Sequence, residues 1–510
     1  MASFLSVSSS SSPYHNHPLL RGKLTATLTN NPTTTTTSPP TTLPIRKIPS
    51  DLSLPLLGPL RDRFAYFYTQ GRGEYLRSRI NRHRSTVLRL NVPPGPPIAR
   101  DPAVIALLDA VSFPVLFDAD LIEKKNLFTG TFMPSLHLTG GYRTLSYIDT
   151  TEPEHAPLKK LLFFLLSHRR THVVPEFRST FGNLFDSLES DVASAGTADF
   201  SEGNDQAAFN FLIRSLFGKD PAESELGTDG PNIVKKWVLF QLGPILTLGL
   251  PSLLEDLTLH SIRLPSFLIK KDYDRLVKFF LDSSAGSILD EAYRLGLSKE
   301  EAVHNILFST CFNAYGGMTI LFPNVLKWVG RAGSRVQAEL AEEIRAAVKA
   351  EGGEVTMKAM ESMPLMKSVI YECLRIEPPV SLQYGRARKD FIVNSHEAAF
   401  EIRAGELLFG YQPFATKDPR VFDRAEEFVA DRFVGEEKEK LLSHVLWSNG
   451  PENVSPTVGD KQCAGKDFVV LVARMLLVEL FLRYDSFDVE VGASALGSSV
   501  KLTSLKPASF

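Results

Sequence analysis

The sequence predicts a mainly α-helical protein with a minor β part, on three observations. Helical periodicity dominates from Pro153 to Leu374. Alternating and β-branched segments separated by glycines run from Val380 to Gly410, which indicates a small sheet. A last apolar helix is expected over Asp467–Tyr484. Because no internal repeat or linker follows residue 60, we expect residues 46–510 to form a single large domain.

Two segments of the helical region carry specific signals. Pro153–Arg170 has an apolar body and a basic end, which suits the dipole of a helix. Ser298 followed by Glu301 forms a capping-box pattern, and the long helix that it opens is expected to stop near Pro323. This helix carries Gly316-Gly317 in its middle, at about 1 kcal/mol per glycine relative to alanine. Paired glycines there indicate a local distortion or a group packed against bare backbone.

Composition excludes several classes of protein. The chain has 510 residues, with 56 Lys and Arg against 58 Asp and Glu, so its net charge of −2 does not indicate a nucleic-acid binder. With 43% hydrophobic and 22% charged residues, it is expected to be globular. The three cysteines are Cys311, Cys373 and Cys463. They cannot form a disulfide framework and contain no CxxC pair for zinc, so a reducing compartment is expected.

The first fifty residues differ from the rest. They contain no Asp or Glu, but 9 Ser, 10 Thr and four basic residues. Such a stretch cannot bury enough apolar surface to offset its chain entropy and is expected to be disordered. It lacks the apolar region of a secretory signal, and its composition is typical of an organelle transit peptide. We therefore expect a plastid transit peptide over residues 1–45; the alternative is a tail that is merely disordered.

No later segment offers 18 uninterrupted apolar residues, so the sequence predicts no transmembrane helix. The nearest candidate, Trp237–Leu254, is broken by Gly243, Pro244 and Pro251. We interpret it as buried core. The alternative is a surface that dips into a membrane interface.

Cys463 lies in Gly459-Asp-Lys-Gln-Cys-Ala-Gly465, directly before the last helix. The glycines allow the backbone to bend tightly around the sulfur and a flat ligand to come close. A helix N-terminus favours the thiolate, which could be a nucleophile or an iron ligand. A buried structural thiol is the alternative for a cysteine taken alone.

Two more features accompany this cysteine. Glu372 and Arg375 lie one turn apart on a helix about 90 residues upstream, and Asp431-Arg432-Phe433 lies about 30 residues upstream. In this order, the three features resemble the cytochromes P450. The resemblance implies a cytochrome P450 fold, haem b with Cys463 as its axial iron ligand, and structural support from Glu372, Arg375 and Arg432.

The sequence departs from a monooxygenase in the long helix. That class delivers protons to bound oxygen with an acid–alcohol pair, yet no acidic residue lies between Glu301 and Arg331, and Thr319 has no carboxylate before it. The cysteine loop starts with Pro456 in place of the usual Phe and carries an extra stretch, Trp447–Ser455. A ferric haem that receives no electrons can still cleave a substrate that already contains an O–O bond. These departures imply that no reductase is required.

The same departures resemble the plant fatty-acid hydroperoxide-metabolising cytochromes P450, a family of allene oxide synthases, hydroperoxide lyases and divinyl ether synthases. The resemblance runs from about Leu43 to Phe510. Its motifs are Pro93-Pro-Gly-Pro96, Asn126-Leu-Phe-Thr-Gly-Thr131, Leu138-Thr-Gly-Gly-Tyr-Arg143, Asn313 with Gly316-Gly317, Tyr371-Glu-Cys-Leu-Arg375, Trp447-Ser-Asn-Gly-Pro451 and Lys461-Gln-Cys-Ala-Gly-Lys-Asp467. Within the family, Cys463–Val470 and Arg483–Asp488 are most similar to the plastid allene oxide synthase branch.

The resemblance implies roles for four residues around the substrate. Asn313 would hydrogen-bond the hydroperoxide and hold it over the iron. Phe128 would stack near the carbon radical left by O–O cleavage; an aliphatic residue at this place goes with the lyase outcome, so Phe128 favours the synthase. Ser146 is a second pocket position, and Thr319 occupies a position that is often Lys and would line the substrate end.

For the haem propionates, the family pattern implies Lys124, His155, Lys159 and Lys461, whose cationic donors match carboxylates. His155 and Lys159 are spaced i, i+4, so both would project from one helix face. Three departures bear on substrate or product choice. Asp460 replaces the usual Asn, Phe132 a usual Tyr, and Leu136-His137 the usual Thr-Glu.

The expected function is conversion of a C18 fatty-acid hydroperoxide to an allene oxide without O2 or NADPH, in oxylipin and jasmonate biosynthesis. The expected substrate is 13-hydroperoxylinolenate, and the expected place is the chloroplast, with peripheral contact to a plastid membrane. The nearest alternative is a hydroperoxide lyase or divinyl ether synthase, which makes the same cleavage. More remote alternatives are a haem monooxygenase and a non-catalytic haem carrier.

Overall fold

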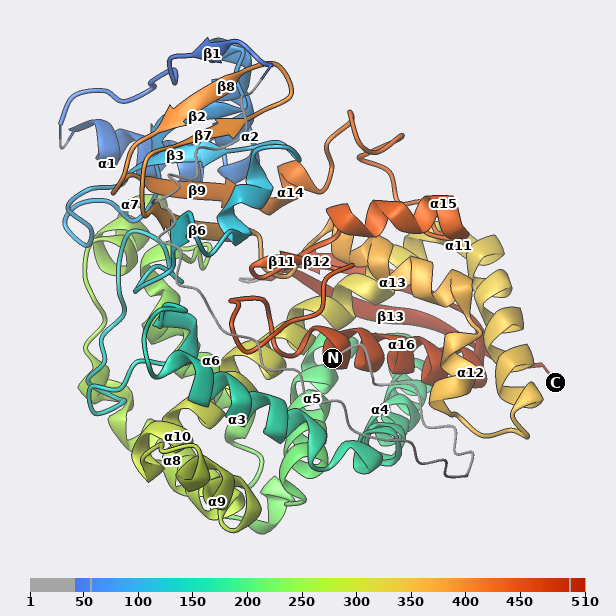
Figure 1. Cartoon of the computed structure of the whole chain (residues 1–510). Helices are drawn as coiled ribbons and strands as arrows, with labels where there is room; N and C mark the ends of the chain where they lie inside the picture. The colour runs from blue at the N-terminus through green and yellow to red at the C-terminus, as the bar shows by residue number, and fades with distance from the viewer. Residues whose placement is uncertain (1–41, 56, 495–496, 510) are drawn as a thin grey trace, which may run out of the picture.

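The computed structural model describes residues 42–55, 57–494 and 497–509. The expected transit peptide therefore lies almost entirely outside the described residues. The strands between residues 45 and 123 and between 382 and 411 gather at one end of the molecule together with the first two helices, whereas the strands after residue 484 lie within the larger helical body beside them (Figure 1). This arrangement confirms the predicted fold class of mainly α with a minor β part.

The helices are α1 (Leu57–Phe64), α2 (Arg72–His83), α3 (His155–Ser167), α4 (Val173–Ala195), α5 (Phe200–Phe217), α6 (Gly230–Leu242), α7 (Ser252–Glu255), α8 (Lys270–Ser284), α9 (Ser287–Arg294), α10 (Lys299–Leu307), α11 (Gly316–Ala350), α12 (Met357–Glu361), α13 (Pro364–Ile376), α14 (Gln412–Ala415), α15 (Glu436–Glu439) and α16 (Lys466–Arg483). The strands are β1 (Ile45–Arg46), β2 (Val87–Asn91), β3 (Ala103–Leu107), β4 (Ile122–Glu123), β5 (Ala198–Asp199), β6 (Leu382–Ala387), β7 (Phe391–Asn394), β8 (Ala399–Ile402), β9 (Leu407–Tyr411), β10 (Leu446–Trp447), β11 (Gly450–Pro451), β12 (Tyr484–Ala493) and β13 (Ser498–Pro507).

The largest sheet has the strand order β2-β3-β9-β6-β4. The pair β3–β9 is parallel, and the other pairs in this sheet are antiparallel. Two three-stranded sheets, β1-β8-β7 and β12-β13-β5, and the hairpin β10-β11 complete the β part. The strands predicted between Val380 and Gly410 are confirmed as β6 to β9. The long β12–β13 pair was not predicted.

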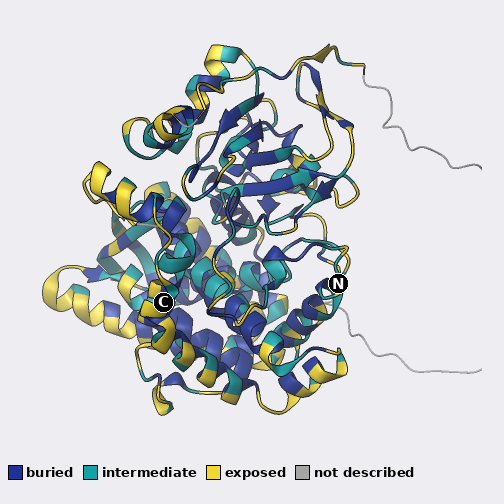
Figure 2. Cartoon of the chain, turned by 90° about the vertical axis from the view of Figure 1, so that its left-hand side faces the viewer, coloured by how far each residue is buried: buried dark blue, intermediate teal, exposed yellow. Residues whose placement is uncertain are grey.

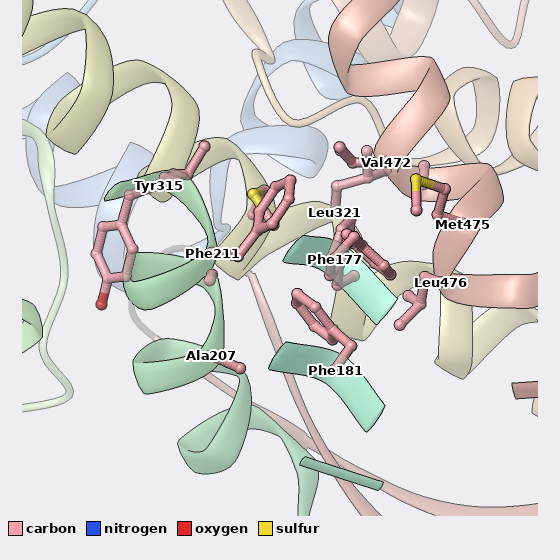
Figure 3. Close-up of a cluster of buried hydrophobic side chains, with 14 of the residues drawn as sticks. Phe177, Phe181, Ala207, Phe211, Tyr315, Leu321, Val472, Met475 and Leu476 are labelled. Atoms are coloured by element: carbon pink, nitrogen blue, oxygen red, sulfur yellow. The ribbon is translucent and has the colours of Figure 1, made fainter. Parts of the chain in front are cut away.

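The helical body has an apolar core that holds α11 and α16 in place. Phe177 and Phe181 of α4 stack at 4.2 Å between ring centroids and lie against Phe322 of α11. Met475 and Leu476 of α16 point into the same cluster (Figure 3). Figure 2 shows buried residues filling the interior, with exposed residues on the outer helices. The helix that follows Cys463 and the helix that carries Gly316-Gly317 therefore share one rigid core.

The long helix predicted from Ser298 begins as expected, because the Ser298 hydroxyl accepts a hydrogen bond from Glu301 N at 3.2 Å. Its predicted end near Pro323 is wrong, because helical structure continues to Gly333, where φ is 84°, and then to Ala350. Burial of the flanking Phe322 and Val325 offsets the cost of the missing proline hydrogen bond, about 3 kcal/mol. The predicted distortion is present: Phe308–Tyr315, directly before the two glycines, is π-helical.

By length and composition alone, the stretch Lys299–Ala350 could cross a membrane, but 56% of its apolar window is buried inside the protein. It is the central helix of the core. The interpretation of Trp237–Leu254 as buried core is correct only for its first part. Trp237 is buried, whereas Leu253 and Leu254 are 69% and 52% exposed, because the prolines and glycines end α6 and carry the chain over the surface.

Gly410 in the centre of β9 tests the packing of the large sheet. A Cβ atom there would lie 2.4 Å from Phe113 and 2.6 Å from Leu116, both fully buried. We expect Gly410→Ala to lower the free energy of unfolding by about 1–3 kcal/mol through overpacking. The measurement is the midpoint of chemical unfolding, followed by circular dichroism.

The matched control is Gly73→Ala in α2, where a Cβ atom would meet nothing within 4 Å. Alanine should leave stability unchanged there or raise it by up to about 1 kcal/mol. Equal effects of the two substitutions would contradict the close packing at Gly410.

Candidate functional site

Cys463 lies three residues before α16, with its side chain half-buried. Its N–H donates to the carbonyl of Ser448 at 3.0 Å, and its own carbonyl accepts from Lys466 N at 3.3 Å. A Cβ atom on Gly465 would lie 3.9 Å from Cys463 Sγ, so the loop leaves little room beside the sulfur. Burial raises the pKa of the Cys463 thiol, and the Gly465 N–H and the charges of Lys159 and Lys466 only partly oppose this. A bound metal ion would favour the thiolate further.

The extra stretch before the cysteine forms the hairpin β10–β11, which supports the loop. Asn449 at its tip has φ 60°, and a Cβ atom on Gly450 would lie 2.6 Å from the Gln462 side chain. Close approach of the hairpin to the loop therefore requires glycine. Glu452 then connects the hairpin to α16, because its carboxylate accepts from Trp447 Nε1 at 2.5 Å and from Lys466 Nζ at 3.2 Å. Sequence reasoning missed Glu452 and Lys466, although an acid inside the inserted stretch and a lysine after the cysteine were visible signals.

Glu372, Arg375 and Arg432 form one buried ion-pair cluster, as the motif pattern predicts. The Glu372 carboxylate accepts from Arg375 Nε at 2.6 Å and from Arg432 Nε at 2.9 Å. Glu372 and Arg375 are fully buried. The other guanidinium nitrogens of Arg375 and Arg432 donate to backbone carbonyls between residues 416 and 427. The cluster therefore fixes the chain segment that leads towards the cysteine loop.

Four basic side chains come together from distant parts of the sequence. Lys124, His155 and Lys159 are buried, and Lys461 is half-buried. Lys124 Nζ donates to the carbonyl of Tyr384 at 2.6 Å, and Lys461 Nζ donates to the carbonyls of residues 145 and 148 at 2.6 and 2.8 Å. Within the described part of the chain, neither of these two lysines has an ion-pair partner.

The mutual proximity of these groups changes their protonation. Burial, and then the charge of Lys461, lowers the pKa of Lys124 to about 7. Burial, and then Lys159, lowers the pKa of Lys461 to about 7, and His155 falls to about 4 because of burial and the same two lysines. The charges of Asp149 and Glu152 only partly oppose these shifts, so collecting so many cationic groups is unfavourable unless a further anion joins them.

Lys159 differs from the other three because it has an acidic partner. Its Nζ donates to the Asp460 carboxylate at 2.6 Å and to the Asp460 carbonyl at 2.5 Å. Asp460 is the residue that replaces the family's usual Asn. The structure thus brings all four predicted basic residues together but directs Lys159 to the cysteine loop.

The residues fit haem b. His155 Nε2 is buried without a hydrogen-bond partner among the described residues, and the lysines Lys124 and Lys461 require negative charge. Two propionates supply two carboxylates. On the bare helix, a Cβ atom on Gly317 would meet nothing within 4 Å, which leaves space for a flat group. Lys124, His155, Lys159 and Lys461 would hold the propionates, and Cys463 would hold the iron.

Asn313 lies in the π-helical segment, one turn before Gly317. Its side chain is exposed, and in the part of the chain that the structure describes its amide has no hydrogen-bond partner. Asn313 and Gly317 are spaced i, i+4 on the helix axis, so the amide lies above the glycine surface. An amide with free donors is available to a ligand.

Phe128 belongs to an aromatic cluster beside Asn313. Its ring centroid lies 5.8 Å from that of Phe312 and 5.5 Å from that of Tyr147, in edge contacts. Phe312 in turn stacks on Phe308 at 4.6 Å. Since Phe312 precedes Asn313 directly, the cluster brings Phe128 next to the helix segment that carries the amide.

The structure gives less support to a pocket role for the other two predicted residues, Ser146 and Thr319. Ser146 lies in the turn Leu145–Tyr147, in the segment whose carbonyls accept from Lys461. The Thr319 hydroxyl donates to the Gly316 carbonyl at 3.0 Å, one turn back, so this group is already satisfied within the helix. The structure gives Thr319 no contact that singles it out for a ligand.

A separate cavity of about 590 Å³ opens between β1, α2 and the loop after α14. It includes none of the residues above. The buried Asp109 and Asp418 and the half-buried His396 lie there, with their ligand atoms within 4.8 Å of one another. Both carboxylates already accept backbone N–H groups, and His396 bonds to Asp418 at 2.6 Å, so this cluster has a structural explanation.

The cysteine loop before a core helix, the Glu–Arg–Arg cluster and the cationic propionate cluster define a haem-thiolate protein of the cytochrome P450 class. The family profile described as Cytochrome P450 matches residues 334–492. A crystal structure of the haem domain of a cytochrome P450DA mutant has the same fold, with a TM-score of 0.66 at 14% identity, and the match covers 90% of this chain and 98% of that one.

Relatives that align over most of this chain identify its family within the cytochrome P450 class. The chain is 64% identical to allene oxide synthase 1, chloroplastic, of rice (Oryza sativa subsp. japonica) over 92% of this chain and 91% of the relative. It is 62% identical to the tomato (Solanum lycopersicum) protein of that name and 60% identical to allene oxide synthase, chloroplastic, of Arabidopsis thaliana, over 88% and 90% of those proteins and 92% of this chain. The chain belongs to the allene oxide synthase family and is a haem-thiolate enzyme of the lyase type.

A substitution of Lys124 tests whether the basic cluster binds the haem propionates. We expect Lys124→Met to weaken haem binding roughly ten- to a hundredfold, because a charged hydrogen bond contributes about 1.5–3 kcal/mol. The matched control is Lys125→Met, whose exposed side chain pairs with Glu152 at 3.3 Å and should leave haem binding unchanged. The measurement is the rate of haem transfer to an acceptor protein.

The same residue predicts a pH dependence. With a pKa of about 7 in the absence of haem, Lys124 is mostly neutral above pH 8 and must take up a proton to pair with a propionate. Haem affinity should therefore fall as pH rises from 7 to 9. In Lys124→Met, the contribution of Lys124 to this fall in haem affinity should be lost. An unchanged pH dependence of haem affinity would contradict the assignment of Lys124 to a propionate.

Proposed function

We propose that this enzyme dehydrates a C18 fatty-acid hydroperoxide, 13-hydroperoxylinolenate, to an allene oxide and water. Haem bound through Cys463 supplies the iron that cleaves the O–O bond. Neither O2 nor NADPH nor a reductase is needed, because the oxidising equivalent is already in the substrate. The observation that carries the proposal is Asn313, an exposed amide with no hydrogen-bond partner among the described residues. It lies one turn before Gly317 and directly after Phe312, whose ring contacts that of Phe128.

Asn313 positions the hydroperoxide. Its side-chain amide has two N–H donors and one carbonyl acceptor, so it can hydrogen-bond both oxygens of the O–O–H group. Because these groups are unused in the described protein, the substrate does not compete with an internal partner. Holding the reacting oxygen in one place lowers the entropy cost of cleavage.

Phe128 directs the product. Homolysis of the O–O bond leaves an alkoxyl radical, which adds to the neighbouring double bond and so forms an epoxide with a carbon-centred radical beside it. This radical then gives one electron to the haem. Loss of a proton from the resulting cation gives the allene oxide, and the cleaved oxygen leaves as water. The face of an aromatic ring stabilises a nearby cation. Phe308 and Phe312 hold Phe128 in edge contact, so the ring cannot turn away freely.

The long helix argues against the monooxygenase alternative. Between Glu301 and Arg331 the sequence has no carboxylate to deliver protons to bound oxygen. The hydroxyl of Thr319 is occupied by the Gly316 carbonyl. A hydroperoxide substrate needs no such relay.

The experiment that tests this function mixes purified ferric protein with 13-hydroperoxylinolenate without NADPH and without oxygen. We expect rapid loss of the conjugated-diene absorbance and recovery of α- and γ-ketols, the hydrolysis products of an allene oxide. Asn313→Ala should lower kcat/KM roughly tenfold or more through the lost hydrogen bonds, whereas Asn210→Ala on α5 should not. Intact hydroperoxide in haem-loaded protein would refute the proposal.

Phe128→Leu should change the product rather than the rate of hydroperoxide loss. An aliphatic side chain removes the ring face, so short aldehydes should increase at the expense of ketols. Phe279→Leu on α8, a buried phenylalanine whose ring contacts Phe280 rather than the cluster around Phe128, is the matched control and should keep ketols as the product. Product analysis by gas chromatography decides; aldehydes from the unsubstituted enzyme would favour a hydroperoxide lyase, and divinyl ethers a divinyl ether synthase.

We place the enzyme in the plastid, where its product would enter oxylipin and jasmonate biosynthesis. The relatives from rice, tomato and Arabidopsis are named chloroplastic. The acid-free, Ser- and Thr-rich composition of residues 1–45 supports a transit peptide that is removed from a haem domain over 46–510.

We also propose peripheral contact with a plastid membrane through the segment 248–268. The apolar side chains exposed there, each by 43–69%, are Leu248, Leu250, Leu253, Leu254, Leu257, Ile262, Phe267 and Leu268. A contiguous apolar surface of this kind marks an interaction site. Arg63 of α1 donates to Asp256 at 2.6 and 2.9 Å, so the segment is held firmly on the body of the protein.

The double substitution Leu253→Glu/Leu254→Glu should reduce co-sedimentation with galactolipid vesicles several-fold, since burial of each leucine contributes about 1.5–3 kcal/mol. The control Val111→Glu/Tyr293→Glu changes two similarly exposed apolar residues elsewhere and should bind as before. Equal loss in both variants would refute this surface, as would equal binding of the first variant and the parent.

A further inference from the structure

Arg72, the first residue of α2, is a half-buried cation without an acidic partner. Its Nη1 donates to the Ser381 hydroxyl at 3.1 Å, and its guanidinium lies over the Tyr66 ring, with Cζ 5.5 Å from the ring centroid. Its Nε is buried and has no hydrogen-bond partner among the described residues. In this part of the chain, no carboxylate forms an ion pair with Arg72.

Two buried arginines on either side of it in the sequence are paired. Arg63 lies 2.6 Å from the Asp256 carboxylate, and Arg79 lies 2.8 Å from that of Asp51. A guanidinium that leaves water without an anion loses solvation, which neutral hydroxyl groups replace only in part. An anionic ligand would therefore be stabilised at Arg72, whereas the other two guanidinium groups are already satisfied.

Neutral tyrosines surround this cation. Burial alone would lower the pKa of the guanidinium, but the hydroxyls of Tyr66, Tyr411 and Tyr384 raise it above its usual value. Burial in turn raises the pKa of Tyr66 and Tyr411. The tyrosines are therefore neutral at pH 7 and leave the positive charge of Arg72 uncompensated. A carboxylate has acceptor oxygens for the guanidinium and for hydroxyl donors together.

The contacts of this cluster lead to the proposed reacting centre. Ser381 directly precedes β6, and Tyr384 of that strand packs on Gly130, where a Cβ atom would lie 2.6 Å from the ring. Gly130 lies two residues after Phe128, and Leu127 belongs to the same apolar cluster as Tyr384. A hydrocarbon chain that starts at the guanidinium therefore meets apolar side chains on its way to the Phe128 ring.

The same cluster contacts the segment 248–268, which we assign to membrane contact. Tyr66 lies edge-on to Phe67, with ring centroids 5.3 Å apart, and Phe67 stacks on His260 of that segment at 4.2 Å. The series of contacts thus places Arg72 between the exposed apolar surface and the reacting centre. A fatty acid that enters tail first from a membrane has its carboxylate at such a position.

We propose that Arg72 binds the carboxylate of the fatty-acid hydroperoxide, with the Ser381 and Tyr66 hydroxyls as neutral partners. This subsite rests on the proposed function and adds to it the group that holds the far end of the substrate. Asn313 holds the hydroperoxide, so the substrate is fixed at two points. Two-point binding sets how far the reacting carbon lies from the carboxylate.

The test compares the free acid of 13-hydroperoxylinolenate with its methyl ester, which carries no negative charge, on the haem-loaded full chain. Arg72→Met should raise KM for the acid roughly tenfold or more, because a charged hydrogen bond is lost, and should leave kcat unchanged. KM for the ester should be the same in parent and variant. Arg72→Lys keeps the positive charge and should retain part of the preference for the acid.

The matched control is Arg77→Met on the same helix. Its guanidinium is 56% exposed and lies 3.9 Å from Glu426, so both KM values should stay as in the parent. Equal rises in KM for acid and ester in Arg72→Met would overturn the subsite, because a structural defect affects both substrates. An unchanged ratio of the two KM values would overturn it as well.

A binding measurement separates failure of this subsite from failure of the proposed reaction. Linolenate has the carboxylate but no O–O bond, and its affinity for the haem-loaded protein is measured by calorimetry without turnover. Arg72→Met should weaken linolenate binding roughly tenfold, and methyl linolenate should bind equally to parent and variant. Equal affinity of parent and variant for linolenate would refute the role of Arg72, whether or not the hydroperoxide is consumed.

Discussion

The buried carboxylate of Glu372 is the interaction on which the site depends. It is fully buried and accepts from two guanidinium groups, which in turn bind the backbone carbonyls of the segment 416–427. Removing one member would leave an unpaired buried charge, which costs about 3–5 kcal/mol. The cluster lies on α13, which packs on α11 and α16. The cluster therefore fixes the segment 416–427 on α13, and the packing of α13 connects it to the helix that carries Gly316-Gly317 and to the helix that follows Cys463.

The basic cluster, in contrast, has an excess of positive charge. Lys124, Lys461 and His155 are brought together without enough negative charge, and burial lowers the pKa of each. The fold tolerates this cost because a dianionic cofactor removes it. Haem binding and protein stability are therefore linked, since a ligand that binds only the native state stabilises it. For Lys159, the ion pair with Asp460 offsets part of the same cost.

Much of the fold followed from local patterns. The helices around Pro153–Arg170, Glu372–Arg375 and Asp467–Tyr484 and the strands between Val380 and Gly410 are present because apolar periodicity and turn glycines act over short distances. The prediction that Pro323 ends a helix failed because tertiary packing of Phe322 and Val325 overrode a local preference. Leu253 and Leu254 were expected to be buried because hydropathy does not tell core from exposed apolar surface.

The sequence by itself determined the chemistry that is available: a cysteine between glycines, an amide three residues before a bare helix segment, and acids missing from the long helix. These are properties of neighbouring residues, and short-range geometry is enough to interpret them. Only the tertiary structure decided that Phe128 lies against Phe312 and that Lys159 binds Asp460. Such contacts join residues about 180 and 301 positions apart, and the free energy of packing the whole core determines which of them form.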